Sequence, residues 1–489
     1  MPIPLRHSED IFIYNIIAYF NKKFTIHLEL FVVQCTLNDY RLKGETYMKH
    51  RLFNAVKLLM ILCMLFILCS CASTVDDLYQ LPQLSEQNFQ LQEQMDAILN
   101  RGASYSPPSS GSHRQSVQLQ DLNGDGTREA IAFFRVPNAD KPLNIRIFSY
   151  TNGEYVESAK IEGEGESIDS ISYSDMDSDG HMELIIGWQI GVDIKLLTIY
   201  TITDFQPYLV QSTNYTDYSL CNLNNSGENV FVVRTNPSSM TGEAELYTLR
   251  SDGEMESDIA ALSVGITAVS RIQTSQLLNG VNAVFVECTT AEGMITDIFT
   301  FQINEFTNIT GMTSDPALSG TYRKASAYCT DINNDNVLDI PVLIPINTSS
   351  DSTTTYYATR WYSYSSSGRQ SLTMTTFHNN TDGWYFVLSD TWLDEISIRR
   401  ETSPGTRSIV FSVNIGNNTT EDFLVISALT GDNREDNAIS GDRFILATHG
   451  EVSYTGEIVS ELVLPFEVSK ELVSDCFELI YSEWVVTEK

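Results

Sequence analysis

Short apolar runs recur along the chain, and each follows directly on a loop rich in Asp, Asn and Gly. Three of these runs are AIAFF (130–134), LIIGW (184–188) and IPVLI (340–344). Apolar runs of about five residues bounded by turn-forming residues are typical of buried strands, because helices need longer patterns. The pattern therefore predicts a mainly β fold in which one type of loop repeatedly leads into a strand.

The spacing of these loops indicates an internal repeat. The loops begin at 121, 175 and 331, so the intervals are 54 residues and three times 52 residues. Two weaker copies lie between them, at 222–233 and 276–287, and keep the form of the loop without its carboxylates. A period near 52 residues filled with strands and Gly/Asn turns is typical of a four-stranded propeller blade.

Acidic and amide side chains alternate within the three complete loops. This is the spacing of the first half of an EF-hand loop, but a strand follows in place of the second helix, so an EF-hand is excluded. An Asx turn without an ion is the alternative, although such a turn needs only one or two of these residues. Loop positions 1, 3, 5 and 9 are Asp121, Asn123, Asp125 and Glu129; Asp175, Asp177, Asp179 and Glu183; and Asp331, Asn333, Asp335 and Asp339.

The three loops resemble the D-x-[DN]-x-D-G-x-x-[DE] loop of FG-GAP/VCBS-type repeats, over roughly 115–345. The resemblance implies a β-propeller of about five to seven four-stranded blades with Ca²⁺ as cofactor. It also implies that the side chains above are ligands, together with the main-chain carbonyls of Thr127, His181 and Val337. Asn336 replaces the Gly of the motif in the third loop, and the turn tolerates it because Asn also adopts left-handed backbone.

A basic segment followed by an apolar stretch precedes the repeats. Residues 48–70 have the form of a secretory signal peptide, since the uncharged part, 58–70, is too short to span a membrane comfortably. The stretch ends in Leu-Cys-Ser-Cys, which resembles a bacterial lipobox and implies lipidation of Cys71. Residues 1–47 are expected to be an upstream extension outside the protein proper. The mature chain is then extracytoplasmic and anchored to the cell membrane by its N-terminal lipid.

The remaining segments are assigned from local pattern. Within 71–113 we expect the lipidated N-terminus, then a helix with Leu91, Met95, Ile98 and Leu99 on one face, and a linker SPPSSGS at 106–112. Propeller repeats are predicted for 114–367, with Asn152-Gly153 as one hairpin turn. A linker near 366 and a helix at 468–483 predict a small α+β domain over 368–489, with further blades as the alternative.

The amino-acid composition limits the kinds of partner and cofactor that the protein can have. The chain has 489 residues, with 30 Lys and Arg against 63 Asp and Glu, a net charge of −33. Such a chain repels phosphate backbones, so nucleic acid is excluded as a partner, whereas hard cations are favoured. Besides Cys71, the mature chain has four cysteines, which are widely spaced and form no C-x-x-C motif. They are expected to be buried apolar residues, with two disulfides as the alternative. The aromatic run 356–364 is expected to fill the core rather than to stack on sugars.

No catalytic signature is present in the mature chain: there is no H-E-x-x-H, G-x-S-x-G or P-loop pattern. We therefore expect a non-catalytic binding or scaffolding module at the cell surface, whose partner is an unidentified protein or glycan. The alternative is an extracytoplasmic enzyme that acts on polysaccharide or peptide at the propeller mouth, because a pair of catalytic carboxylates can be remote in sequence.

Overall fold

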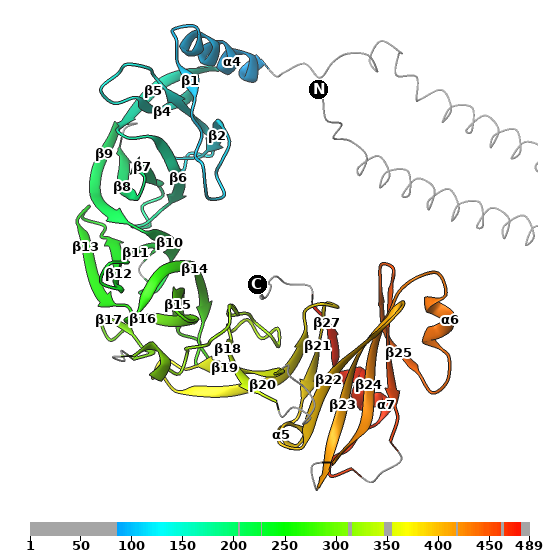
Figure 1. Ribbon diagram of the computed structural model, residues 1–489. Coiled ribbons are helices and arrows are strands. Elements are labelled where there is room, and N and C mark those ends of the chain that lie inside the picture. Colours follow the sequence, from blue (N-terminus) through cyan, green and yellow to red (C-terminus); the bar gives the residue numbers. More distant parts are fainter. Residues whose placement is uncertain are drawn as a thin grey trace, which may run out of the picture. The chain divides into compact units, whose positions relative to one another are not determined.

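The computed structural model describes residues 86–480 except 204–205, 226, 312–314, 347–354, 417–418 and 461–463. The signal peptide, Cys71 and the segment 1–47 lie outside the described residues. The described part is mainly β, as predicted, and its strands form six antiparallel sheets, here called sheets 1 to 6 in chain order (Figure 1). None of the described sheets closes on itself into a barrel.

The first four sheets each come from one continuous stretch of chain. Sheet 1 contains β1 (Ser104–Tyr105), β2 (Val117–Gln120), β3 (Glu129–Arg135), β4 (Leu143–Thr151) and β5 (Glu154–Gly163). Sheet 2 contains β6 (Ser167–Ser174), β7 (Glu183–Gly191), β8 (Ile194–Thr203) and β9 (Gln206–Tyr215). Sheet 3 contains β10 (Asp217–Cys221), β11 (Asn229–Asn236), β12 (Thr241–Leu249) and β13 (Met255–Ala261). Sheet 4 contains β14 (Ile266–Gln276), β15 (Asn282–Thr290), β16 (Met294–Gln302) and β17 (Glu305–Asn308).

The last two sheets are five-stranded. The described helices of the C-terminal part lie between their strands along the chain. Sheet 5 contains β18 (Ile340–Pro345), β19 (Tyr357–Tyr364), β20 (Gln370–Asn379), β21 (Trp384–Leu388) and β27 (Phe477–Leu479). Sheet 6 contains β22 (Ile396–Ser403), β23 (Thr406–Gly416), β24 (Thr419–Leu429), β25 (Phe444–His449) and β26 (Val452–Ile458). The helices are α5 (Asp390–Leu393), α6 (Arg434–Ala438) and α7 (Lys470–Cys476), and a 3₁₀ turn, η1 (Pro316–Leu318), precedes sheet 5.

The apolar runs found in the sequence form β3, β7 and β18, the strands that follow the repeated loops, and β3 and β7 are buried on both faces. On β7, Ile186 packs against sheet 1, whereas its neighbour Ile185 packs against sheet 3. The same alternation occurs on β11, where Val232 faces sheet 2 and Phe231 faces sheet 4. Because successive side chains on a strand point to opposite faces, a strand between two neighbouring sheets needs apolar residues at every position.

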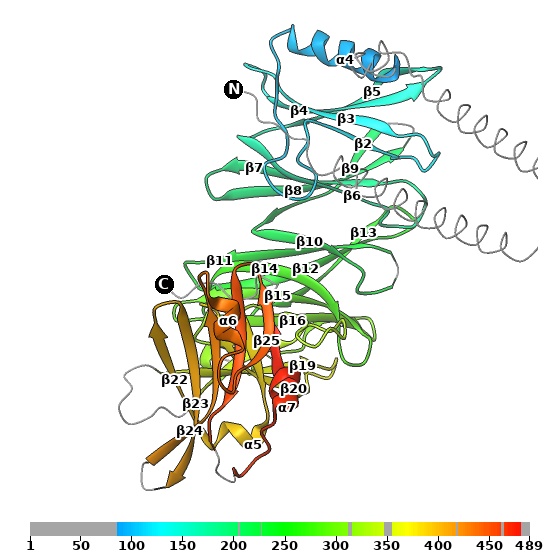
Figure 2. The ribbon, with the colours of Figure 1, turned by 90° about the vertical axis from the view of Figure 1, so that its right-hand side faces the viewer.

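The first sheet has a different neighbour on its other face. Helix α4 (Glu86–Leu99) lies over this sheet (Figure 2). Its buried residues Leu91, Met95 and Ile98 belong to one apolar cluster with Phe134. This confirms the predicted helix and its apolar face. A helix that covers the outer face of a terminal sheet removes apolar surface from water in the manner of a capping element in a repeat array.

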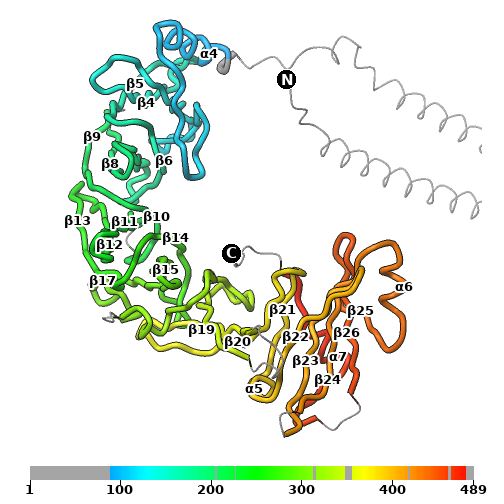
Figure 3. Tube along the Cα trace, viewed as in Figure 1, coloured from blue at the N-terminus to red at the C-terminus, as the bar shows by residue number. Residues whose placement is uncertain are grey.

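Two segments expected to be linkers are integral to the sheets. Within 106–112, the amide of Ser106 donates to the carbonyl of Phe133, and that of Ser109 donates to Ile168, so this segment joins sheets 1 and 2. The segment near 366 is the turn between β19 and β20, the two strands labelled in Figure 3. A hydrogen bond from the Ser365 amide to the Arg369 carbonyl closes this turn. The boundary expected at 368 therefore falls inside sheet 5.

The predicted C-terminal helix is shorter than the pattern at 468–483 suggested. It ends at Cys476, and Phe477 begins β27, which pairs with β21. Phe477 is buried against Trp384, with ring centroids 5.5 Å apart. Packing of this aromatic side chain into sheet 5 outweighs the local helical pattern.

Other local predictions agree with the structure. Asn152 and Gly153, at φ 55° and 91°, form the turn between β4 and β5, as expected for a two-residue hairpin loop. Trp361 in the aromatic run is fully buried and donates a hydrogen bond to Thr376, so this side chain fills the core. The cysteines at 221, 288, 329 and 476 are free, and the first three are buried.

Candidate metal-binding loops

The repeated loops occupy equivalent places in the fold. The first two join β2 to β3 in sheet 1 and β6 to β7 in sheet 2, and the third leads into β18 of sheet 5. The weaker copies occupy the same connection in sheets 3 and 4, between β10 and β11 and between β14 and β15. The sequence repeat is thus also a structural repeat.

Each complete loop is wound around the side chain at position 1. The amide at position 6 donates to this Asp, and the amide at position 7 donates to the residue at position 5. These bonds curl the main chain around the side chain at position 1. In the first and third loops the Asn at position 3 also donates to the Asp at position 5. The bonds to position 1 are Gly126 to Asp121 at 2.9 Å, Gly180 to Asp175 at 3.0 Å and Asn336 to Asp331 at 2.8 Å. Those to position 5 are Thr127 to Asp125 at 2.7 Å, His181 to Asp179 at 2.7 Å and Val337 to Asp335 at 2.8 Å.

The carboxylate at position 9 closes the loop from the start of the following strand. It accepts from the amide at position 2, whose apolar side chain is buried in the core. The sequence analysis did not single out position 2, although an apolar residue stands there in every copy: Leu122, Met176, Leu223, Leu277 and Ile332. The bonds are Leu122 to Glu129 and Met176 to Glu183, both 2.9 Å, and Ile332 to Asp339 at 3.3 Å. Sheet 3 keeps the same bond from Leu223 to Asn229, at 3.1 Å, without the charge.

Two positions of each loop adopt left-handed backbone. Position 6 is Gly126, Gly180 or Asn336, so the predicted tolerance of Asn at this turn is confirmed by its φ of 67°. Position 4 is also left-handed, at Gly124, Ser178 and Asn334. The sequence alone did not reveal this second requirement, because Ser is uncommon in that conformation.

The second loop concentrates negative charge. Carboxylate oxygens of Asp175, Asp177 and Glu183 all lie within 4.8 Å of one another. Burial raises the pKa of Glu183 to about 7, and the neighbouring carboxylate of Asp177 adds to this effect. Burial is likewise the main cause of the raised pKa of Asp177, followed by the charge of Asp179. A cation among these oxygens would relieve both desolvation and repulsion.

The first loop contains a buried oxygen atom without a partner. Asp121 Oδ2 accepts from Gly126, but Oδ1 is buried and has no hydrogen bond within the described residues. Such an orphaned acceptor costs free energy unless an ion or water completes it. The donor set of this loop, carboxylate and amide oxygens alone, is the set that Ca²⁺ prefers. The residues present therefore fit a calcium ion.

Two other predicted ligands, Asp179 and Asp339, already have hydrogen-bond partners within the protein. Asp179 is held by its own loop, because one of its oxygens accepts from the amide and the imidazole of His181. In the third loop, Asp339 is fully buried and accepts from the hydroxyls of Ser363 and Thr373, both at 2.6 Å. These hydroxyls partly satisfy the Asp339 carboxylate.

Neighbouring loops touch through their main chains. The amide of Met182 donates to the carbonyl of Leu122 at 2.8 Å, which joins the first two loops. A Cβ atom on Gly124 would stand only 2.5 Å from the carbonyl oxygen of Gly180. Glycine at position 4 of the first loop is thus required by its neighbour as well as by its backbone conformation.

This contact leads to a prediction about stability. Gly124→Ala should lower the free energy of unfolding by about 1–2 kcal/mol for the left-handed backbone and a further ~1–3 kcal/mol for the clash with Gly180. Gly126→Ala is the matched control, because Gly126 is also left-handed but has no atom within 4 Å of a Cβ. Urea denaturation of both variants measures the difference. Equal losses would show that the loops do not constrain each other.

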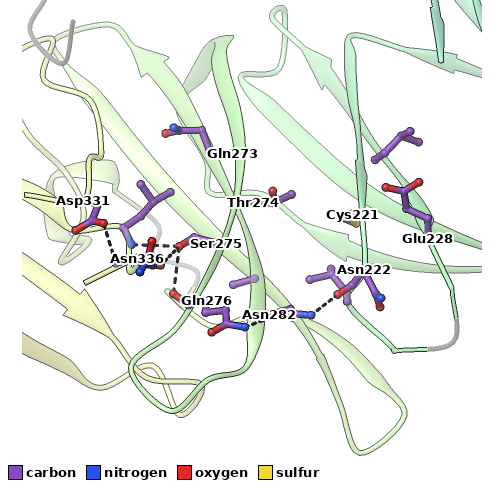
Figure 4. A pocket seen from close by; sticks show the side chains of 14 residues that line it. Cys221, Asn222, Glu228, Gln273, Thr274, Ser275, Gln276, Asn282, Asp331 and Asn336 are labelled. Atoms are coloured by element: carbon purple, nitrogen blue, oxygen red, sulfur yellow. Dashed lines mark hydrogen bonds between the residues drawn. The ribbon is translucent and has the colours of Figure 1, made fainter. Parts of the chain in front are cut away.

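A pocket of about 750 Å³ lies beside the third loop (Figure 4). Its lining comes from β10 and the loop after it in sheet 3, from β14 and the start of β15 in sheet 4, and from Asp331, Asn336 and Leu338 of the third loop. Two carboxylates, Glu228 and Asp331, stand among its lining residues, and none of the lining residues is basic. Sequence reasoning missed this pocket, because its residues come from three repeats.

Comparisons with known proteins concern only the fold. No protein-family model and no curated protein match the sequence. A rhamnogalacturonan lyase aligns with 64% of this chain and 70% of its own, at 10% identity and a TM-score of 0.26. An exo-β-1,3-galactanase from Phanerochaete chrysosporium aligns with 68% of this chain and 85% of its own, at 11% identity and a TM-score of 0.25. A polysaccharide lyase aligns with 73% of this chain and 92% of its own, at 9% identity and a TM-score of 0.28.

These alignments correct one expectation from the sequence. The absence of short catalytic motifs led us to expect a protein that is not an enzyme, whereas the aligned structures are lyases, a galactanase and, in a further case, a mannose phosphorylase. The motifs sought were those of other enzyme classes, and carboxylate pairs leave no such local signature. At these TM-scores the alignments assign no activity to this chain.

Among the described residues, no helix has the length and apolarity needed to cross a membrane.

Proposed function

We propose that this protein is a calcium-binding repeat protein of the β-propeller type, whose sheets 1 to 5 are blades and whose three complete loops each hold Ca²⁺. The observation that carries the proposal is the orphaned, buried Oδ1 of Asp121 inside a loop that recurs with the same hydrogen bonds in two further repeats. Turn formation by itself accounts for the oxygen atoms that accept from amides, but not for an acceptor left without a partner.

Calcium in these loops would act mainly on stability. The carboxylate at position 9 of each loop begins the following strand or lies directly before it, and it is deeply buried in all three repeats. An ion that neutralises this carboxylate lowers the cost of burying it, and binding to the folded state alone stabilises that state. The weaker loops of sheets 3 and 4 lack the acidic ligands, so we assign no ion to them.

The direct test is anomalous scattering from crystals grown in Ca²⁺. We expect peaks within about 2.3–2.6 Å of the side-chain oxygens at positions 1, 3 and 5 of the first and second loops. The third loop should also be occupied, with its Asp339 carboxylate still bonded to Ser363. Data from crystals grown in chelator supply the control. Saturating Ca²⁺ without a peak in any loop would refute the proposal.

We place the mature protein outside the cytoplasm, attached to the cell membrane through a lipid on Cys71. Support for this comes from the basic and apolar segments at 48–70 and the lipobox-like sequence that ends in Cys71. In that location, Ca²⁺ is available at the concentrations that weak extracellular sites require. The role that follows is display of a ligand-binding surface, with an unidentified protein or glycan as partner.

The anchor has its own test. Cys71→Ser should abolish metabolic labelling of the protein by a fatty-acid probe, because the thiol is the acceptor of the lipid. Cys69→Ser, two residues earlier, is the matched control and should leave labelling unchanged. If the Cys71 variant still carried the label, the lipoprotein assignment would fail.

A second candidate function is that of an extracytoplasmic enzyme acting on polysaccharide or peptide. The pocket favours it, because Glu228 and Asp331 supply two carboxylates, the groups that glycoside cleavage uses. Release of reducing ends from polysaccharides, lost in Glu228→Gln, would support this function. Intact substrates after prolonged incubation with the wild type would argue against it.

A further inference from the structure

The pocket beside the third loop has a lining rich in neutral polar side chains, together with two acidic and five apolar residues. Seven of its side chains are neutral and polar: Gln273, Thr274, Ser275 and Gln276 on β14, Asn282 on β15, and Asn222 and Asn336 in the loops of sheet 3 and before sheet 5. Amides and hydroxyls offer donors and acceptors side by side, whereas a charged lining would offer one kind only. The volume of about 750 Å³ is within the range of pockets that bind small molecules.

Hydrogen bonds across the sheets hold several of these side chains in place (Figure 4). Asn282 of sheet 4 donates to the carbonyl of Asn222 at 2.7 Å, and Ser275 donates to the carbonyl of Asn336 at 3.3 Å. The lining is thus organised before a ligand arrives, which reduces the entropy lost on binding. The same bonds tie sheet 3, sheet 4 and the third loop together around the pocket.

One lining group lacks a partner. Gln273 Oε1 is buried and accepts no hydrogen bond from the described residues. A hydroxyl donor from a ligand would satisfy it. The carboxylates of Glu228 and Asp331 already accept from Ser174 and from the amides of Asp335 and Asn336, so a ligand hydroxyl would add to those bonds. These two acids, without a basic residue in the lining, repel anionic ligands such as phosphates and uronates.

An extended peptide fits the pocket less well than a compact ligand does. Peptides bind sheet edges by adding a strand, and β14 is the edge strand of sheet 4 here. At its end, however, Gln276 already forms a parallel bridge with Val337, and Leu338 donates its amide to Ser275. The third loop therefore occupies the place that a continuing peptide strand would need.

We propose that this pocket binds a neutral saccharide, whose hydroxyls donate to Gln273 Oε1 and to the two carboxylates and accept from the amides and hydroxyls of the lining. This goes beyond the calcium-binding function and requires no catalysis. Asp331 is shared by the pocket and the third loop, so the test must report on saccharide and ion separately.

The test uses the full chain and saturation-transfer NMR with three neutral trisaccharides, maltotriose, cellotriose and β-1,4-galactotriose, and with trigalacturonate as the anionic counterpart. At least one neutral trisaccharide should bind at millimolar concentration, and trigalacturonate should bind more weakly. Gln273→Ala and, independently, Thr274→Val should each weaken binding about tenfold, or ~1.4 kcal/mol. Gln206→Ala on β9, which lies outside the pocket, is the control and should bind as the wild type does.

Three results would overturn the proposal: no signal from any neutral trisaccharide, tighter binding of trigalacturonate, or unchanged affinity in both pocket variants when their melting temperatures match the wild type. The measurement is repeated in chelator and followed by a calcium titration of the same sample. Saccharide binding without a heat of calcium binding would contradict the calcium proposal alone, and the reverse result would contradict the pocket alone.

Discussion

Glu287→Ala is expected to lower the free energy of unfolding by about 3–5 kcal/mol, because it leaves a buried cation without its counter-ion. Glu287 and Arg323 are both fully buried and 2.8 Å apart. The same carboxylate accepts from the side chain of Arg271 and from the amide of Cys329, both at 2.7 Å. One side chain on β15 thus joins β14 to the segment that leads into the third loop.

Urea denaturation measures this loss, with an exposed ion pair as the control. Glu162→Ala breaks the pair with Lys160, whose side chains are 44% and 40% exposed, and should cost about 0–1 kcal/mol. Glu287→Gln keeps the shape of the side chain and should be less destabilising than Glu287→Ala. If all three variants unfolded at the same urea concentration, the buried pair would not be an organising contact of sheet 4.

Removal of calcium is expected to have an effect of similar size. A site filled at one hundred times its dissociation constant stabilises the folded state by about 2.7 kcal/mol, so three independent sites together contribute up to ~8 kcal/mol. Chelation should therefore lower the melting temperature by several degrees. Thermal unfolding with chelator, and again after excess Ca²⁺ is restored, measures this change.

Single substitutions rank the loops. The second loop has four carboxylates and the other two have three each, so the second should attract a dication most strongly, although repulsion within the empty site opposes this gain. Asp177→Ala should weaken calcium binding more than Asn333→Ala, the matching position of the third loop. Asn222→Ala, in the weaker loop of sheet 3, should leave it unchanged. The opposite order for the first two variants would show that carboxylate number does not set affinity here.

The sequence predicted the repeat and its strands because both rest on local chemistry. Asp, Asn and Gly at fixed offsets determine the turn, and an apolar run directly afterwards determines a strand buried on both faces. The apolar residue at position 2 escaped notice because one buried side chain, such as Leu122, has no periodicity of its own. Its function is visible only where its amide meets the carboxylate of Glu129.

Features that depend on distant segments were not predictable in this way. The linker expected near 366 has the composition of any polar turn, and only the pairing of β19 with β20 shows that it lies within a sheet. The C-terminal strand at Phe477 has a helical pattern but finds an apolar partner in Trp384. The pocket likewise combines residues that are more than 100 positions apart, such as Asn222 and Asp331.

The central claim, that the repeated loops bind calcium, is tested most directly by calorimetric titration of the chelator-treated full chain with Ca²⁺. The reference is a variant in which Asp121, Asp175 and Asp331 are all replaced by asparagine. We expect saturable heat from the wild type, little from Mg²⁺, which demands a small octahedral shell, and none from the variant. No heat from the wild type, or the same heat from the variant, would contradict the account and reduce the loops to turns.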